Sequence, residues 1–475
     1  MTTHVQNLIG GEWVGDAAVE RRNPAREQDV VALAPRGQAS DVAAAVQAAA
    51  AAAPAWARLP APARGAILLN AADLLRGRQG SVATDLVREE GKTLAEATGE
   101  VRRAIDVLRF FGSLGWRAGG EVLPSATPGT TVLTRREPIG VVGAITPWNF
   151  PIAIPAWKIA PALVSGNAVV LKPAELTPLS ATHLATALVD AGLPAGVLNV
   201  VHGSGERAGA ALAADPGVAA LTFTGSTAVG LHLHHVLSRR RARVQLEMGG
   251  KNAYLVLDDA DAATAAATVA AGAFALTGQA CTATSRVYCT PSVLDAFTTA
   301  LADAAKRFVP GDGLAESTTL GPVVSDEQLR VDVAAVEAAT MAGGRLVTGG
   351  TRDGRFFAPT VFTDVDHGSD LVRDEVFGPV VAVLGVDDYE EGLARVNDSR
   401  YGLTAGICTR DLHFAHDFAA RAMAGVVKVN RPTTGLDLNV PFGGVRDSSS
   451  NTFREQGAAA VDFSNWSKTV YLGHD

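Results

Sequence analysis

The segment Thr277-Gly-Gln-Ala-Cys281-Thr-Ala-Thr-Ser-Arg286 contains one of only three cysteines in the chain. Gly278 permits a close approach of the backbone, and the small and hydroxyl residues after Cys281 leave room around its sulfur. A nucleophilic cysteine needs a lowered pKa or a neighbouring base, an accessible sulfur, and donors for the oxyanion that it creates. A lone cysteine is more often a buried structural residue, so this segment alone leaves both roles open.

Two further polar residues have a local sequence that suits catalysis. Glu247 lies between an apolar strand and the pair Gly249-Gly250, and burial there would raise its pKa into the range of a general base. Asn149, in the rigid corner Pro147-Trp-Asn-Phe-Pro151, can direct its amide into a cleft. A helix cap or salt bridge for Glu247, and a plain turn for Asn149, are the alternatives.

Three predicted strands end in residues suited to a nucleotide. Gly225-Ser-Thr-Ala-Val-Gly230, His202-Gly-Ser-Gly205 and Leu171-Lys-Pro-Ala-Glu175 each follow an apolar strand. Glycine turns expose backbone N–H groups to a pyrophosphate, and a carboxylate at a strand end can accept both ribose hydroxyls, which disfavours a 2′-phosphate. Each segment alone could be a surface turn, but three in one βαβ region favour dinucleotide binding.

The elements that must position these residues alternate between strand and helix. Residues 1–40 suggest short strands, with a hairpin tip at Gly10-Gly11. We expect a helix from Asp41, as its cap, to Ala53 before Pro54, and further helices over 61–76 and 80–118. From residue 138 onward strands and helices alternate, which predicts an α/β fold with a doubly wound, mostly parallel sheet. We expect strands at 139–145, 167–171, 196–201 and 218–223, and helices at 178–191 and 205–214.

Composition and charge exclude several classes of protein. The 475 residues carry a net charge of −8, which gives no general basic surface for nucleic acid or an acidic membrane. Apolar runs are too short to span a bilayer, and no secretory signal is expected at the N-terminus. Three scattered cysteines do not make a disulfide framework or a zinc site, and His232, His234 and His235 lack metal-ligand spacing. We therefore expect a cytoplasmic protein without a bound metal.

Seven segments, in order and spacing, resemble the signatures of the aldehyde dehydrogenase superfamily over essentially the whole chain. The segments are Pro147–Pro151, Lys172–Glu175, Phe223–Ser226, Leu246–Lys251, Gly278–Cys281, Glu375–Pro379 and Pro441–Gly444. Within that family, the residues around Cys281 and from Leu436 to Gln456 look most like α-ketoglutarate semialdehyde (2,5-dioxopentanoate) dehydrogenases. The chain departs from the usual pattern at Ser448–Glu455, where many relatives have a glycine-rich run, so we expect a loop of different shape near the substrate entrance.

The resemblance implies a catalytic role for four residues and a nicotinamide dinucleotide as cofactor. Cys281 would attack the aldehyde, Asn149 and the Cys281 N–H would bind the oxyanion, Glu247 would activate the hydrolytic water, and Glu455 would relay protons. Glu175 favours NAD, while use of NADP stays open. The residues expected at the cofactor are Ile145, Thr146, Pro147, Trp148, Lys172, Pro173, Ala174, Glu175, Gly205, Phe223, Thr224, Gly225, Ser226, Val229, Met248, Gly249, Glu375 and Phe377.

The substrate tunnel is also carried over from the family pattern. Its expected walls are Arg103, Phe150, Ala153, Ile154, Trp157, Ala280, Thr282 and Leu436 or Leu438. A guanidinium at Arg103 could grip a distal carboxylate in bidentate fashion, which favours a carboxylated semialdehyde such as α-ketoglutarate semialdehyde. The alternative is a helix-surface salt bridge with Glu100 or Asp106, three residues away on either side.

The resemblance also divides the chain. We expect a dinucleotide-binding domain over 1–118 and 139–248, a catalytic domain over 249–446, and an oligomerisation arm over 119–138 and 459–475. Such an arm predicts a homodimer or homotetramer. The expected reaction is hydrolytic, NAD(P)-dependent oxidation of an aldehyde to a carboxylic acid. Alternatives are a dehydrogenase for neutral aliphatic or aromatic aldehydes, an acylating relative that uses coenzyme A, a cysteine hydrolase, and a non-catalytic protein of the same fold.

Overall fold

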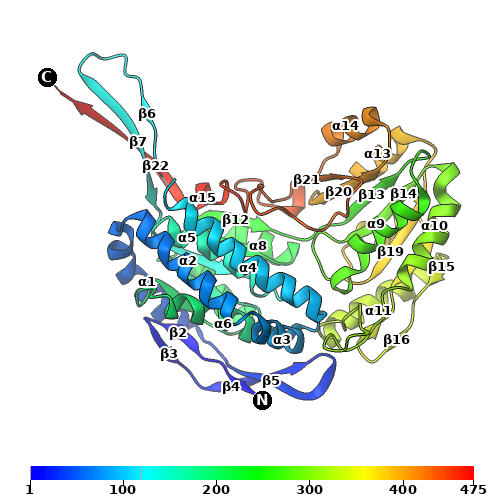
Figure 1. Ribbon diagram of the computed structural model, residues 1–475, viewed down its shortest axis with the longest axis horizontal. Coiled ribbons are helices and arrows are strands. Elements are labelled where there is room, and N and C mark those ends of the chain that lie inside the picture. Colours follow the sequence, from blue (N-terminus) through cyan, green and yellow to red (C-terminus); the bar gives the residue numbers. More distant parts are fainter. Residues whose placement is uncertain (1, 118, 475) are drawn as a thin grey trace.

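Two seven-stranded sheets, each covered by helices on both faces, form the body of the protein (Figure 1). A computed structural model describes residues 2–117 and 119–474. Residues 1, 118 and 475 lie outside this range, and with them the domain limits predicted at these three positions.

The first sheet carries the strand ends predicted to bind a nucleotide. Its order is β12 (Arg243–Glu247), β11 (Ala220–Thr224), β8 (Val141–Ile145), β9 (Ala168–Lys172), β10 (Leu198–Val200), β2 (Asn7–Ile9) and β3 (Glu12–Val14). The strands from β12 to β10 are parallel, and β2 and β3 continue the sheet antiparallel. The chain runs outward from β8 to β10 and then returns to β11 on the other side of β8. This reversal opens a crevice beyond the carboxyl ends of β8 and β11.

Alternating side chains of this sheet enter two separate cores. In β9, Val169 and Leu171 face one core, and Ala168 and Val170 face the other. The first core is covered by α2 (Ala61–Gly77), α3 (Gln79–Glu90), α4 (Leu94–Leu114), α5 (Ala153–Val164) and α6 (Pro178–Asp190). The second is covered by α1 (Ala39–Arg58), α7 (Ala210–Ala214) and α8 (Thr227–Ser238). A π-helical turn over Gly205–Gly209 begins the helix predicted at 205–214.

The second sheet carries the segment of Cys281. Its order is β15 (Arg345–Thr348), β18 (Thr360–Thr363), β19 (Val380–Gly385), β14 (Thr284–Cys289), β13 (Asn252–Val256), β20 (Thr404–Cys408) and β21 (Val426–Val429). All these strands are parallel except β15. One face packs on α9 (Ala262–Phe274) and α10 (Pro291–Ala305), and the other on α13 (Tyr389–Asn397) and α14 (Leu412–Arg421). Helices α11 (Asp326–Met341) and α12 (Asp370–Arg373) enclose a further core beside β18 and β19.

A narrow antiparallel ribbon projects from the body (Figure 1). It consists of β22 (Asn465–Gly473), β7 (Thr130–Pro138) and β6 (Val122–Leu123), in that order, and α15 (Ala460–Phe463) leads into β22. Nine residue pairs join β7 to β22 from Pro138–Asn465 to Thr130–Gly473. The remaining strands form a sheet of β1 (Thr3–His4), β5 (Arg26–Pro35) and β4 (Ala17–Asn23), and a hairpin of β16 (Arg352–Asp353) and β17 (Phe356–Phe357).

Three helix boundaries differ from the prediction. Helix α1 continues through Pro54 to Arg58, because its apolar face continues to the buried Trp56. Its cap is Gln38, whose N–H donates to the carboxylate of Asp41 (2.7 Å). The helix predicted over 80–118 is two helices, since Gly91 adopts a left-handed conformation (φ 110°) that ends α3, and Thr93 caps α4.

Candidate active site

Cys281 lies just before the amino end of β14, after a tight turn. Leu276 and Thr277 in this turn have left-handed backbones, with φ of 55° and 57°. Such conformations are costly for residues other than glycine, so tertiary contacts must hold them. The Leu276 N–H donates to the carboxylate of Glu96 (2.8 Å), and the Thr277 hydroxyl donates to the Gly321 carbonyl (2.9 Å). The turn thus holds the thiol at a fixed place.

Cys281 lines a cavity of about 390 Å³, whose other walls come mainly from α4, α5 and the loop before β14. Most of the predicted tunnel residues line it: Arg103, Phe150, Ala153, Ile154, Trp157, Ala280, Thr282 and Leu436. Leu438 does not, because it packs against the apolar core of the cofactor domain. Sequence reasoning missed several wall residues, among them Glu96, Leu276, Thr434 and Phe442. Among these, only Phe442 lay in a segment that the sequence had singled out.

Asn149 approaches the nucleophile from the carboxyl end of β8. Its side chain is buried, and Nδ2 donates to the carbonyl of Gln279 (2.9 Å), two residues before Cys281. An amide nitrogen carries two N–H groups, so one hydrogen stays available for a second acceptor. This arrangement suits an oxyanion donor next to the thiol.

Burial raises the pKa of the Cys281 thiol, and the negative charges of Glu375, Glu247 and Glu455 raise it further. The resting side chain is therefore a thiol. A nucleophilic cysteine needs either a lowered pKa or a neighbouring base. Because the pKa of Cys281 is raised, the reaction needs a base.

Glu247, the last residue of β12, is a candidate for that base. It is buried, and its carboxylate accepts the Gly444 N–H (3.1 Å) and the Ser449 hydroxyl (3.4 Å). Burial raises its pKa well above the usual value, and the negative charge of Glu455 adds to the effect. A carboxyl group with a raised pKa can take up a proton near neutral pH, which a surface carboxylate cannot.

Glu455 belongs to a buried polar network next to Glu247. It forms an ion pair with Lys158, which also donates to the Thr222 hydroxyl (2.9 Å). The Thr222 hydroxyl in turn donates to the Gln245 side-chain oxygen (2.8 Å). The second carboxylate oxygen of Glu455 is buried without a hydrogen-bond partner among the described residues. The network therefore has a free acceptor for a proton.

Arg103 makes no ion pair with Glu100 or Asp106. Its Nη2 donates to the Gln456 side-chain oxygen and to the Asp437 carbonyl (3.1 Å), both of which are uncharged. Glu100 is instead bound to Lys92 (2.6 Å). Within residues 2–117 and 119–474, no carboxylate pairs with the Arg103 guanidinium, which lines the same cavity as Cys281.

The carboxyl ends of β9 and β10 border a second cavity, of about 340 Å³. Ala174, Glu175, His202 and Arg207 are among its walls. The carboxylate of Glu175 accepts the Gly205 N–H (3.2 Å), while Lys172 donates to the carbonyls of Pro173 (2.7 Å) and Gly203 (3.1 Å). Burial lowers the pKa of Lys172 to about 8. A carboxylate and an amine beside glycine turns fit the ribose and phosphates of a dinucleotide.

The crevice between β8 and β11 also has the features of a dinucleotide site. The hydroxyls of Thr146, Thr224 and Thr227 are buried without partners among the described residues, and α8 begins directly after Gly225-Ser226. Orphaned hydroxyls and a helix N-terminus at one crevice fit a phosphate-bearing ligand. The side chains of Ile145, Phe223 and Met248 pack in the core below it, and Val229 is exposed on α8.

Glu375, Phe377 and Trp148 lie where this crevice approaches the catalytic domain. The Glu375 carboxylate accepts the Gly250 N–H (3.0 Å), and a side chain at Gly249 would meet it at 2.1 Å. Phe377, in a left-handed conformation (φ 61°), packs edge to face on Trp148 with 5.4 Å between ring centroids. These residues fit the contacts expected for a nicotinamide ribose and ring. Three other residues predicted at the cofactor, Pro147, Pro173 and Ser226, lie in the loops after β8, β9 and β11, respectively.

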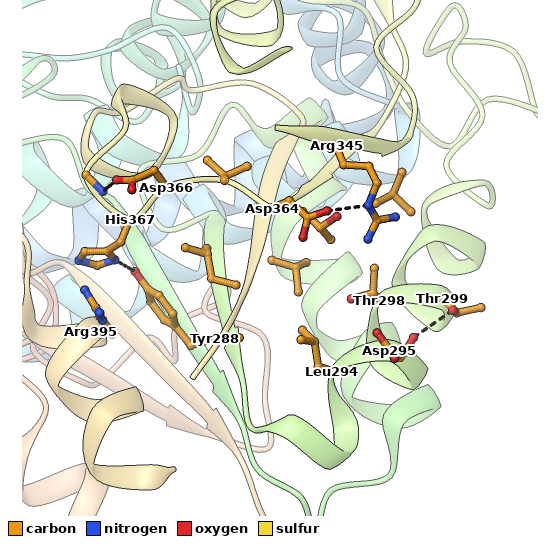
Figure 2. A pocket seen from close by; sticks show the side chains of 17 residues that line it. Tyr288, Leu294, Asp295, Thr298, Thr299, Arg345, Asp364, Asp366, His367 and Arg395 are labelled. Atoms are coloured by element: carbon orange, nitrogen blue, oxygen red, sulfur yellow. Dashed lines mark hydrogen bonds and ion pairs between the residues drawn. The ribbon is translucent and has the colours of Figure 1, made fainter. Parts of the chain in front are cut away.

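A larger cavity of about 690 Å³ lies elsewhere in the catalytic domain (Figure 2). It borders the carboxyl ends of β18 and β19, whereas Cys281 precedes the amino end of β14. Figure 2 shows two contacts among its walls: Arg345 pairs with Asp364 (2.7 Å), and His367 bonds to Tyr288 (3.0 Å). None of the predicted site residues lines it among the described parts of the chain, so it is separate from the active site.

Within the described residues, no helix is both long and apolar enough to cross a membrane. The same residues contain no cluster of three or more histidine, cysteine, aspartate or glutamate side chains arranged for a metal ion.

Comparisons with known proteins show the family of the chain. Residues 13–470 match the model of the aldehyde dehydrogenase family. The chain is 47% identical to an α-ketoglutarate semialdehyde dehydrogenase of Haloferax volcanii, over 99% of both chains. It is 42% identical to a 2,5-dioxopentanoate dehydrogenase of Saccharolobus solfataricus, over 98% of both.

Solved structures give the same result. An NADP-dependent enzyme of Escherichia coli superposes with a TM-score of 0.96 and 35% identity, over 99% of this chain and 98% of that one. An NAD-dependent aldehyde dehydrogenase of Sinorhizobium meliloti gives a TM-score of 0.96 and 34% identity, over 99% and 95%. With the family match over nearly its full length, the chain belongs to the aldehyde dehydrogenase family and is an NAD(P)-dependent aldehyde dehydrogenase.

Proposed function

We propose that this enzyme oxidises an aldehyde with a distal carboxylate to the corresponding acid, and that α-ketoglutarate semialdehyde is its substrate. The observation that carries the proposal is the Arg103 guanidinium, which lines the Cys281 cavity and has no carboxylate partner among the described residues. A partly buried guanidinium binds a carboxylate through two parallel N–H bonds, because its fork matches the two oxygens. The names of the two relatives above support the same substrate.

Each catalytic side chain has a role in this proposal. The Cys281 sulfur attacks the aldehyde carbon, and its proton passes to a neighbouring base, for which Glu247 is placed. The carbonyl oxygen becomes an oxyanion, which the free Asn149 N–H and the Cys281 N–H stabilise. When bound, the dinucleotide supplies the hydride acceptor that lets the thiohemiacetal become a thioester.

Hydrolysis of the thioester then restores the thiol. Glu247 takes a proton from the attacking water, since its raised pKa gives it affinity for that proton. The neighbouring Glu455–Lys158 pair, with its unpartnered carboxylate oxygen, offers a path for that proton away from the site. A base at this position favours water over coenzyme A as the final acyl acceptor.

Substrate preference tests the proposal directly. The purified enzyme is assayed with α-ketoglutarate semialdehyde, succinate semialdehyde and a neutral aldehyde, each with NAD and with NADP. We expect a higher kcat/KM for the acidic aldehydes. In Arg103→Met, the ratio of acidic to neutral kcat/KM should fall about 10- to 100-fold, as for loss of hydrogen bonds to a charged group. Arg102→Met, at an exposed neighbour on α4, serves as the matched control.

A preference for neutral aldehydes would overturn the substrate and leave the reaction class intact. The same holds if Arg103→Met lowers acidic and neutral activities equally. The apolar walls Phe150, Ile154 and Trp157 would then set the substrate instead.

We also propose that NAD is the preferred dinucleotide. Glu175 lies at the carboxyl end of β9 in the cavity predicted for the ribose, where its negative charge repels a 2′-phosphate. Arg207 lines the same cavity, and its positive charge attracts a 2′-phosphate, so we expect some use of NADP. Glu175→Gln should shift the ratio of kcat/KM values toward NADP, and an unchanged ratio would contradict the assignment.

A further inference from the structure

A buried ion pair lies directly behind the loop of Asn149. Lys92 and Glu100 have side chains that are 1% exposed, and the Lys92 ammonium lies 2.6 Å from the Glu100 carboxylate. The same ammonium donates to the backbone carbonyl of Asn149 (2.7 Å) and lies 4.7 Å from the centroid of the Phe150 ring. Lys92 therefore contacts the two residues that carry the oxyanion donor and one wall of the substrate cavity.

Glu100 holds the other end of the same loop. One of its carboxylate oxygens accepts the N–H groups of Ile152 (3.0 Å) and Ala153 (3.2 Å), at the start of α5. A carboxylate at a helix N-terminus is favoured by the exposed N–H groups and the helix dipole. The pair thus fixes the loop from the Asn149 carbonyl to the first turn of α5.

The local sequence explains how a charged lysine reaches this place. Gly91, with its left-handed backbone, ends α3 and turns the chain inward, and Thr93 then caps α4. Burial lowers the pKa of Lys92, but the charges of Glu100 and Glu90 outweigh this effect and raise it overall. Lys92 is therefore a buried cation that stays charged.

The first turns of α4 also reach the nucleophile. Glu96, one turn before Glu100, accepts the Leu276 N–H in the strained turn before Cys281. Two neighbouring carboxylates of one helix thus hold both loops that supply oxyanion donors.

We propose that Lys92, with Glu100, is a positioning residue that sets the Asn149 amide for oxyanion binding. The inference rests on the oxyanion role proposed above for Asn149. Lys92 itself touches no reacting atom; it acts through the Asn149 carbonyl and the start of α5. A buried pair of this kind specifies a geometry more than it adds stability, because desolvation offsets the attraction of the charges.

A mutant cycle between Lys92 and Asn149 separates positioning from general stability. The variants are Lys92→Met, Asn149→Ala and the double variant, with kcat/KM for the aldehyde measured at saturating cofactor. Removal of one oxyanion donor lowers the rate about 100- to 1000-fold, so Lys92→Met alone should lower kcat/KM at least about 10-fold. In the Asn149→Ala background, the same change should lower it less than about 2-fold, because the group that Lys92 positions is gone.

Arg64→Met is the matched control. Arg64 is also a buried cation that donates to a backbone carbonyl of α5, but at the far end of that helix, to Val164 (2.9 Å). It should leave kcat/KM within about 2-fold of the wild type while it lowers the thermal midpoint. If Lys92→Met does not fold, Glu100→Gln replaces it, since the amide oxygen still accepts the Ile152 N–H while the partner charge of Lys92 is lost.

The outcomes are distinct. Equal fold-losses from Lys92→Met with and without Asn149, or no loss in the single variant, would overturn the positioning role. Full activity of Asn149→Ala would instead overturn the proposed oxyanion donor itself. A loss in Lys92→Met that disappears in the Asn149→Ala background would support the inference.

Discussion

At the scale of single residues, the site combines an inert thiol with a carboxyl group of high pKa. Burial and three neighbouring carboxylates keep the Cys281 thiol protonated at rest, and the same burial raises the pKa of Glu247. Proton transfer between them is therefore part of the reaction, and the rate should depend on the protonation of Glu247.

The first prediction concerns the pH dependence of turnover. Glu247 acts as a base only when it is deprotonated, so kcat for the wild type should rise with pH across the raised pKa of this carboxyl group. In Glu247→Gln this rise should be absent, and kcat should fall about 100- to 10,000-fold. A rise of unchanged shape in the variant would show that another group is the base.

The second prediction concerns stability. A carboxyl group whose pKa is raised on folding stabilises the folded state below its unfolded pKa, and this contribution is lost as pH rises through the folded pKa. Glu247→Gln removes the burial of a charge, so its thermal midpoint should match the wild type near pH 5 and exceed it at pH 8. The folded state binds the proton of this carboxyl group more tightly than the unfolded state does. For each tenfold difference between the two states, the free energy of unfolding of the variant should gain about 1.4 kcal/mol at high pH. A difference that shrinks as pH rises would contradict the raised pKa.

The sequence predicted the proposed catalytic residues but not the residues behind them. Cys281, Asn149 and Glu247 stand in distinctive segments, and the structure brings them together. Lys92 and Glu96 lie in a stretch for which the sequence predicted only a continuous helix, and their partners are 57 and 180 residues away. Only tertiary structure shows such contacts, just as it shows that Leu438 faces the core and not the cavity.

At the scale of elements, strands and helices with a clear apolar period were the easiest part to predict. Strand β8 and the helices α2 and α6 follow the predicted ranges within about two residues, because strand and helix periods differ clearly there. Single proline and glycine residues were a less dependable guide to where a helix ends. Pro54 does not end α1, since the packing of Trp56 continues the helix, whereas Gly91 ends α3 within an otherwise continuous helical pattern.

The third prediction follows from Pro54. This residue is exposed, lies inside α1, and removes a helical hydrogen bond without any visible packing role. Pro54→Ala should therefore raise the free energy of unfolding by about 1–3 kcal/mol, as measured by urea denaturation. Pro62→Ala is the control, because Pro62 lies in the first turn of α2, where no such bond is lost. Equal effects of the two substitutions would contradict the explanation.

At the scale of the whole molecule, the proposed active site combines residues of the two large sheets. The carboxyl ends of the first sheet bring Asn149 and Glu247, and the loop before β14 of the second brings Cys281. Neither domain alone contains the full site, so their relative placement matters for catalysis. The composition of the chain predicts its class, but not this placement.

The fourth prediction concerns the projecting ribbon. Its strands expose large apolar side chains, including Val122 (79% exposed), Tyr471 (70%) and Leu472 (49%). Apolar surface on an antiparallel ribbon with free edges favours association with a second copy of the chain. We expect a homodimer or homotetramer by light scattering after size exclusion. The double variant Val122→Asp/Tyr471→Asp should shift the protein toward monomer. A wild-type protein that is monomeric at micromolar concentration would contradict the role of the ribbon in association.

The most direct test of the whole account is a rapid-mixing measurement of reduced nicotinamide with Glu247→Gln. If Glu247 accepts the proton of the Cys281 thiol and then activates the hydrolytic water, this variant should slow the burst of reduced nicotinamide as well as the later turnover, which should be about 100- to 10,000-fold slower than in the wild type. Cys281→Ala should give neither burst nor turnover. Sustained turnover in Cys281→Ala, or wild-type steady-state turnover in Glu247→Gln, would contradict the covalent mechanism at the meeting of the two domains.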